Sequence, residues 1–136
     1  MIRYKILIST YGIMHIRPTI QSDLPQLKQV LDSIELFPSE MLDDMIADFF
    51  HHSDSPEIWL TAEVDGIPQG IAYCVPEQMT NGTYNLLAIG VKQALQGKGI
   101  GQQIMTHLEE FLRNQGQHIL IVDTSGTDGF QRTRKF

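Results

Sequence analysis

Two short apolar segments, residues 83–91 and 118–122, flank a segment of helical periodicity at residues 99–114. Aliphatic residues recur every three to four positions in the middle segment, whereas the flanking segments are too short for helices and favour strands. A strand, a helix and a second strand in this order predict a right-handed parallel crossover. The 83–91 strand is apolar on both faces, which predicts a buried central strand in an α/β fold.

The residues before this unit predict an antiparallel front half of the sheet. The expected elements are a possible extra strand at 3–9, a strand at 15–19, helices capped near Ser22 or Asp23 and beginning near Pro38-Ser39, and strands at 58–64 and 68–75. The turn Asp65-Gly66 between the last two is typical of a hairpin. After the last apolar strand, Thr127-Asp128 predicts the start of a further helix.

Length and composition indicate one domain. The chain has 136 residues, of which 42% are hydrophobic, and it contains no linker or repeat. We assign residues 14–136 to the domain and residues 1–13 to an N-terminal extension. A single cysteine, Cys74, favours a reducing compartment, and no segment is typical of a signal peptide, so a cytoplasmic location is expected.

Charge and residue content disfavour several partners. The formal net charge of −6 lacks the basic surface that nucleic-acid binding needs. No run approaches the roughly 20 apolar residues that span a membrane. The pair His51-His52 follows a predicted helix, whose C-terminus favours cations, and no metal site is expected there.

The turn before the 99–114 helix contains the segment Gln96-Gly97-Lys98-Gly99-Ile100-Gly101. Glycines allow backbone conformations closed to other residues and let a ligand approach the main chain. The first N–H groups of the following helix lack intrahelical partners, and the helix dipole is positive there. With the charge of Lys98, these features predict a phosphate site.

Two common phosphate-binding loops do not fit this segment. A P-loop requires Ser or Thr directly after its lysine, but Gly99 follows Lys98. A dinucleotide loop requires a third glycine three residues after the second, and the two possible frames place Gln102 or Ile104 there. A generic nucleotide-binding module is therefore disfavoured.

The pattern Gln-x-x-Gly-x-Gly resembles the pyrophosphate loop of the GNAT N-acetyltransferases. The preceding phrase Leu87-Ala88-Ile89-Gly90-Val91-Lys92 looks like the central strand of that family, and the order of elements from Met14 onward is similar too. The resemblance implies a mixed sheet with an antiparallel front half and a parallel central pair that is splayed for coenzyme A. It also implies acetyl-CoA as the acetyl donor, with no metal.

The resemblance implies a role for each matching residue. The cofactor-binding residues would be Ile89, Gly90, Val91, Gln96, Gly97, Lys98, Gly99, Ile100, Gly101 and Gln102. The loop N–H groups would hold the pyrophosphate, and the pantetheine arm would pair with the strand at 89–91. The N–H of Ile89 would stabilise the developing negative oxygen of the acetyl group, which makes Ile89 the catalytic position.

The sequence also departs from the family pattern. Asn85 stands where some members have a glutamate base, so the base would be water or another residue. The chain ends at Phe136, before the position of the family's tyrosine acid and before its two final strands. The last parallel strand is thus expected to have an open edge, covered by the strand at 3–9 or by a second subunit in a homodimer.

Two functions follow as hypotheses. The first is transfer of an acetyl group from acetyl-CoA to an amine of a small molecule or a peptide. The second is a catalytically weak or inactive acyl-CoA-binding protein that acts as a sensor or assembly partner. The acidic residues Glu40, Asp43, Asp44 and Asp48 could attract a cationic amine, but the favoured interpretation is a solvated helix face.

Overall fold

The computed structural model describes residues 5–9, 12–78, 81–123 and 131–135. Its strands are β1 (Lys5–Ser9), β2 (Gly12–Pro18), β3 (Ile58–Val64), β4 (Ile67–Pro76), β5 (Thr83–Val91), β6 (Ile119–Asp123) and β7 (Gln131–Lys135). Its α-helices are α1 (Leu24–Asp32), α2 (Leu42–His51) and α3 (Ile100–Asn114). The strands form one sheet in the order β1-β2-β3-β4-β5-β6-β7, in which only β5 and β6 are parallel.

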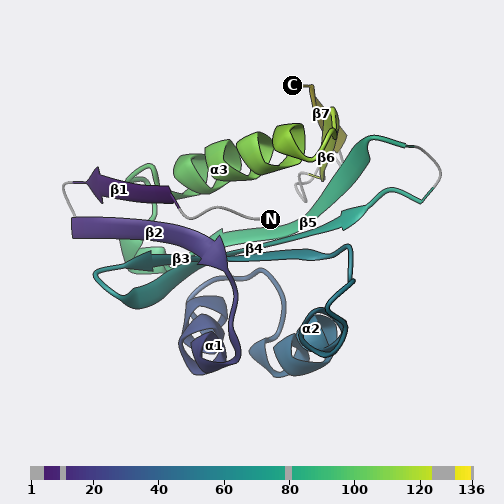
Figure 1. Ribbon diagram of the computed structural model, residues 1–136. Coiled ribbons are helices and arrows are strands. Elements are labelled where there is room, and N and C mark those ends of the chain that lie inside the picture. Colours follow the sequence, from purple (N-terminus) through teal and green to yellow (C-terminus); the bar gives the residue numbers. More distant parts are fainter. Residues whose placement is uncertain (1–4, 10–11, 79–80, 124–130, 136) are drawn as a thin grey trace.

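The sheet lies between two helical layers (Figure 1). Helix α3 covers one face, and α1 and α2 cover the other. In β3, Leu60 and Ala62 pack in the cluster under α3, whereas Trp59 packs in the cluster under α1 and α2. This alternation is the period-two pattern of a strand that is buried on both sides. It explains why the middle of the chain is so apolar.

A β-bulge interrupts this alternation in β5. Tyr73 is opposite Ala88 and Cys74 is opposite Leu86, so Leu87 is the extra residue. A bulge shifts the side chains that follow it to the other face. Leu86 before the bulge and Ile89 after it therefore both lie on the α3 side.

Strands β5 and β6 pair over only part of their length. Their parallel register runs from Thr83 opposite Ile119 to Leu86 opposite Val122. Beyond Leu86, no described strand pairs with this edge of β5, although β5 continues to Val91. The expected mixed sheet with a splayed parallel central pair is confirmed.

The end of the chain differs from the sequence prediction. Residues 131–135 form strand β7, antiparallel to β6, rather than the start of a helix. The predicted beginning at Thr127-Asp128 lies outside the described residues. Because β7 pairs with all of β6 from Ile119 to Asp123, the edge expected to be open is occupied. The structural reason for a covering homodimer is therefore removed.

Strand β1 confirms the extra N-terminal strand, but it does not lie where it was expected. It pairs antiparallel with β2 at the opposite edge of the sheet from β6. A hairpin of neighbouring strands closes with little loss of chain entropy, which favours this placement over a crossing to β6.

Two further local predictions are corrected. Leu87 in β5 is 54% exposed, so the central strand is not buried on both faces, because the bulge turns this side chain outward. Asp23 does not cap α1 with its side chain. Instead, its carboxylate accepts the Ile20 N–H at 2.9 Å across the preceding 3₁₀ turn, Gln21–Asp23.

Asp23 belongs to a charged network that joins β2, the 3₁₀ turn and β3. The guanidinium of Arg17 donates to both carboxylate oxygens of Asp23 at 2.8 Å and to Glu63 at 2.9 Å. The Thr61 hydroxyl donates to Asp23 at 3.1 Å. The side chains of Asp23 and Arg17 are only 4% and 14% exposed, so the two charges depend on each other.

The network predicts a dependence of stability on pH. Burial by itself raises the pKa of Asp23, but the hydrogen bonds from Arg17 and the Ile20 N–H outweigh it, so the pKa is below its ordinary value. The unfolded chain therefore takes up the proton first, and stability is lost as the pH falls below about 4 toward the folded-state pKa. Urea unfolding should be measured for the native protein and for Asp23→Asn from pH 7 to pH 3. At pH 7 the native protein should have the clearly higher free energy of unfolding, and the difference between the two proteins should narrow in acid. A difference that stays constant would contradict the assignment.

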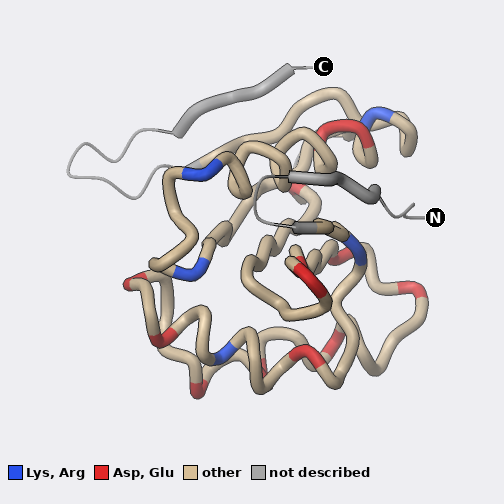
Figure 2. The backbone as a smooth tube through the Cα atoms, turned by 90° about the vertical axis from the view of Figure 1, so that its left-hand side faces the viewer, with Lys and Arg blue, Asp and Glu red and all other residues tan. Residues whose placement is uncertain are grey.

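Acidic residues gather on the part of the molecule that contains α1 and α2 (Figure 2). In residues 20–57 the acidic residues are Asp23, Asp32, Glu35, Glu40, Asp43, Asp44, Asp48, Asp54 and Glu57. Lys28 is the single Lys or Arg in that range. Within the described part of the chain, no helix has the length and apolarity needed to cross a membrane.

Candidate functional site

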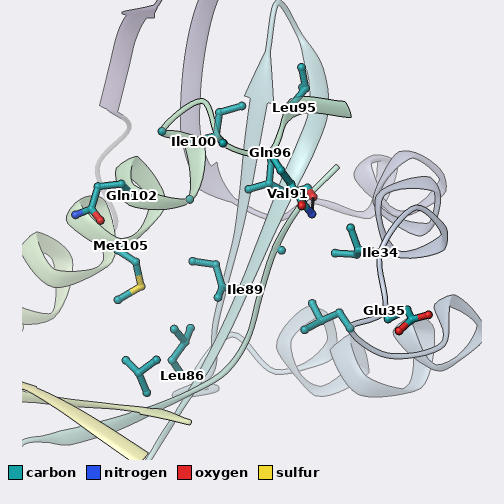
Figure 3. A pocket seen from close by; sticks show the side chains of 16 residues that line it. Ile34, Glu35, Leu86, Ile89, Val91, Leu95, Gln96, Ile100, Gln102 and Met105 are labelled. Carbon is teal, nitrogen blue, oxygen red and sulfur yellow. Dashed lines mark hydrogen bonds between the residues drawn. The ribbon is translucent and has the colours of Figure 1, made fainter. Parts of the chain in front are cut away.

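A groove of about 740 Å³ opens between the unpaired edge of β5 and the start of α3 (Figure 3). Its lining residues are Ile34, Glu35, Leu36, Leu86, Ile89, Gly90, Val91, Leu95, Gln96, Gly97, Gly99, Ile100, Gly101, Gln102, Met105 and Val122. The groove lies where β5 and β6 separate, at the carboxyl end of the parallel pair, and such positions are common ligand sites in α/β sheets.

One end of the groove is made of backbone rather than side chains. Gly97 and Gly99 have φ angles of +78° and +87°, in the left-handed region that favours glycine. Gly99 caps α3, and its carbonyl oxygen accepts the first helical bond from Gln103 N–H at 3.0 Å. The N–H groups of Ile100 and Gly101 have no acceptor within the helix, so this end suits an anion.

The strand register determines how the backbone of β5 faces the groove. Lys92 N–H donates to the Gln69 carbonyl oxygen at 2.9 Å, and hydrogen-bonded residues alternate along an antiparallel pair. Gly90, opposite Ile71, is therefore turned toward β4. The N–H of Ile89 is turned the other way, toward the groove.

Gln96 supports this arrangement and ties the loop to the strand. Its side-chain Nε2 donates to the Val91 carbonyl oxygen at 3.0 Å (Figure 3). That carbonyl also faces away from β4, as the register requires for the residue after Gly90. The bond fixes the distance between the glycine loop and the open edge of β5.

The inner end of the groove is apolar. Ile89 and Met105 approach it from β5 and α3, and Ile34 approaches from the α1–α2 connection (Figure 3). A Cβ at Gly90 would lie 2.5 Å from Cδ1 of Ile34 and 3.1 Å from Cδ2 of Leu36, so a side chain there would displace the ends of these two residues. The groove thus combines an anion-binding end with a narrow apolar end that offers a backbone donor.

The structure brings most of the predicted site residues together. Ile89, Gly90, Val91, Gln96, Gly97, Gly99, Ile100, Gly101 and Gln102 all line the groove. Lys98 does not, and its side chain is exposed. The end of the groove at this loop is therefore lined by residues other than Lys98.

Sequence reasoning missed the contribution of the α1–α2 connection. Ile34, Glu35 and Leu36 line the groove, although they are about 50 residues before β5 in the chain. No local motif marks them, because their place depends on how the helical layer packs on the sheet. The only sequence signal is Gly90, where a missing side chain implies a close neighbour.

A carboxylate does lie beside Asn85. The side-chain amide of Asn85 donates to Glu77 Oε2 at 2.7 Å, and Glu77 comes from the β4–β5 hairpin. Its N–H donates to the Thr83 carbonyl at 2.9 Å, which holds the hairpin in place. The sequence did not suggest this pair, because the two residues are eight positions apart across a turn.

The remaining candidates have structural places. Cys74 is fully buried under α3, and burial raises the pKa of its thiol. Trp59 is also fully buried. His51 ends α2. Among the described residues, no group of three or more His, Cys, Asp or Glu side chains could hold a metal ion.

Comparisons with solved structures show the same fold. A GNAT-family acetyltransferase from Brucella melitensis in complex with acetyl-CoA matches with a TM-score of 0.67 and 22% identity, over 90% of this chain and 88% of that one. The GNAT domain of S. lividans PAT matches with a TM-score of 0.73 and 14% identity, over 98% and 97%. The PaiA N-acetyltransferase of Thermoplasma acidophilum in complex with coenzyme A matches with a TM-score of 0.67 and 16% identity, over 90% and 99%.

A search of curated proteins finds no match. The family model described as "Acetyltransferase (GNAT) family" matches residues 20–131, which include both helical layers, the groove and the glycine loop. This chain therefore belongs to the GNAT acetyltransferase family.

Proposed function

We propose that the protein transfers the acetyl group of acetyl-CoA to the amine of a small molecule or peptide. The observation that supports this most strongly is the groove itself, with backbone N–H groups for an anion at one end and a backbone donor in an apolar recess at the other. Coenzyme A has a pyrophosphate and a long arm that ends in a thioester, and it matches this sequence of environments. The presence of acetyl-CoA and coenzyme A in the related structures supports the choice.

In the proposed mechanism, the pyrophosphate binds the N–H groups at the start of α3. The arm runs along the open edge of β5, and the Ile89 N–H donates to the acetyl carbonyl oxygen. The neutral amine nitrogen attacks the carbonyl carbon, and negative charge develops on that oxygen, where a fixed donor is most effective. The C–S bond then breaks, the thiolate leaves, and the nitrogen loses a proton to water or to another base.

The alternative of an inactive binding protein has less support. It depended on the missing tyrosine acid and on final strands that were expected to be absent, and β7 pairs along the whole of β6. The glycine loop suits either function, whereas the outward-facing N–H of Ile89 favours acetyl transfer.

The test is acetyl transfer by the full chain. Release of free coenzyme A thiol should depend on the added amine and should equal the acetylated amine measured by mass spectrometry. If no amine of a broad panel increases thiol release above the rate of slow hydrolysis, the proposal is wrong.

A substitution at Ile89 tests the role of its N–H. Ile89→Pro removes this donor without removing a bond to β4, whereas Ile89→Ala keeps the donor and shortens the side chain. We expect kcat to fall about 100-fold or more in Ile89→Pro relative to Ile89→Ala, with a smaller change in acetyl-CoA affinity. Equal kcat values in the two variants would exclude the N–H as the stabilising donor.

A further inference from the structure

A second cavity lies on the α2 side of the sheet. It has a volume of about 590 Å³, a size suited to a small molecule. Its lining residues are Asp48, His52, Asp54, Ser55, Pro56, Glu57, Tyr73, Val75, Pro76, Gln78 and Leu87. It shares no lining residue with the groove described above.

The floor of this cavity is apolar and aromatic. Tyr73 is half-buried, and its ring stacks on the fully buried Trp59 with centroids 3.8 Å apart and an angle of 13° between the planes. Val75 lies beside it, and Leu87 exposes 54% of its surface at the bulge. An exposed leucine next to a supported aromatic ring is a surface that an alkyl chain would cover.

The other side of the cavity is negatively charged. Asp48, Asp54 and Glu57 line it, and no Lys or Arg is among its described lining residues. One oxygen of Glu57 accepts the Trp59 indole N–H at 2.9 Å, and His52 lies 3.7 Å from Asp48, so each carboxylate keeps a second oxygen for a ligand. Burial raises the pKa of Tyr73, and the charges of Glu57 and Asp48 raise it further. A cation held here would meet the three carboxylates and an aromatic ring.

The cavity borders the proposed reaction centre. Leu87 lines the cavity, whereas Leu86 and Ile89 line the groove, so the bulge in β5 separates the two spaces by a single strand. Because the cavity lies on the α2 side of the sheet and the Ile89 side chain on the α3 side, an acceptor would reach the thioester only across the open edge of β5.

The carboxylates do not suit the attacking nitrogen itself. That nitrogen must be neutral, and nearby negative charge stabilises its protonated form. They suit a second amine that stays charged while the first one reacts.

We propose that the acceptor is a small dicationic amine, with an alkyl chain on Tyr73 and Leu87 and its non-reacting ammonium group held by Asp48, Asp54 and Glu57. This assignment rests on the proposed acetyl transfer. In this assignment the carboxylates hold the second charge of the acceptor, which a purely apolar cavity could not do.

The experiment compares binding of three probes of equal length to the full chain. They are pentane with an amine at both ends, pentylamine, and pentanoate with an amine at its far end. NMR shifts of the Asp48 and Leu87 amides and the Tyr73 ring would locate the binding. We expect the diamine to bind about tenfold more tightly than pentylamine, with the zwitterion weakest, and the preference to shrink at high salt.

Matched variants identify the carboxylates. The double variant Asp48→Asn with Asp54→Asn should reduce diamine affinity to that of pentylamine. Asp44→Asn is the control, because Asp44 is an exposed acid one helical turn from Asp48 and lines none of the cavities described above. The assignment would be overturned if Asp44→Asn lost as much diamine affinity as the double variant, or if diamine and pentylamine bound with equal affinity. NMR shifts at residues away from the cavity would also overturn it.

Acetyl-CoA binding, measured by calorimetry on the same samples, separates this inference from the proposed function. If the native protein does not bind acetyl-CoA, the acetyltransferase proposal is rejected even if the diamine binds. Intact acetyl-CoA binding without a preference for the diamine would reject the dicationic acceptor alone.

Discussion

Replacing Gly101 with Glu is expected to weaken acetyl-CoA binding about thirtyfold or more while leaving the protein at least as stable as the native chain. A Cβ at Gly101 would meet only Cγ2 of Val91, at 3.9 Å, so the side chain fits without strain. A carboxylate about 4 Å from a phosphate charge costs about 4 kcal/mol near a protein surface. Even half of that corresponds to about thirtyfold in affinity.

The free energy of unfolding should rise in Gly101→Glu, although acetyl-CoA binding weakens. A glutamate in the first turn of α3 interacts favourably with the helix dipole, and replacing a helical glycine adds up to about 1 kcal/mol. Calorimetry with acetyl-CoA and urea unfolding check the two effects. Gly101→Gln is the matched control, since it has the same size without the charge and should bind more tightly than the glutamate variant. Native affinity in Gly101→Glu would show that the phosphates lie elsewhere.

Replacing Arg17 with Met is expected to lower the free energy of unfolding by about 3–5 kcal/mol. The substitution keeps a long side chain but leaves Asp23 and Glu63, which are 4% and 16% exposed, without the cation that now lies between them. Buried carboxylates without a partner are costly, because protein surroundings cannot replace their hydration. Equilibrium urea unfolding at pH 7 measures the effect.

Lys28→Met is the control for that measurement. Lys28 forms an ion pair with Asp43 at 2.6 Å, but the two side chains are 35% and 56% exposed. Solvent screens such a pair, so its loss should cost at most about 1 kcal/mol. If Arg17→Met and Lys28→Met lowered the free energy of unfolding by similar amounts, the buried network would contribute no more to stability than a surface ion pair.

The central crossover could be predicted from the sequence because its signals are local. Two aliphatic strands enclose a helix of clear periodicity, and Gly97 and Gly99 mark backbone that only glycine adopts easily. Helix α3 begins one residue after its predicted start, and β5 has the predicted bounds. These same elements form the anion end of the groove, so that part of the candidate site followed from sequence alone.

Strand β7 could not be predicted in this way. Its sequence, Gln131-Arg132-Thr133-Arg134-Lys135, has no apolar alternation. Its pairing partner β6 determines its conformation, and that contact lies outside any local pattern. Tertiary pairing therefore prevailed over the helical prediction.

The second cavity was hidden for a related reason. The sequence placed Leu87 in a buried strand, but one extra residue at the bulge turned it outward. Asp48 was noted as part of an acidic helix face, whereas Asp54 and Glu57 join it only because α2 returns to the sheet beside Tyr73. A register shift and a packing contact together created the space.

An NMR titration of the full chain with acetyl-CoA tests most directly whether the groove binds this donor. We expect saturable shifts at the amides of Gly99, Ile100 and Gly101, where the pyrophosphate would bind, and at the amide of Ile89, which would donate to the acetyl oxygen. Titration with coenzyme A that has no acetyl group should reproduce the loop shifts and reduce the shift at Ile89. The absence of saturable shifts, or shifts that avoid both the loop and Ile89, would show that acetyl-CoA does not bind in the groove.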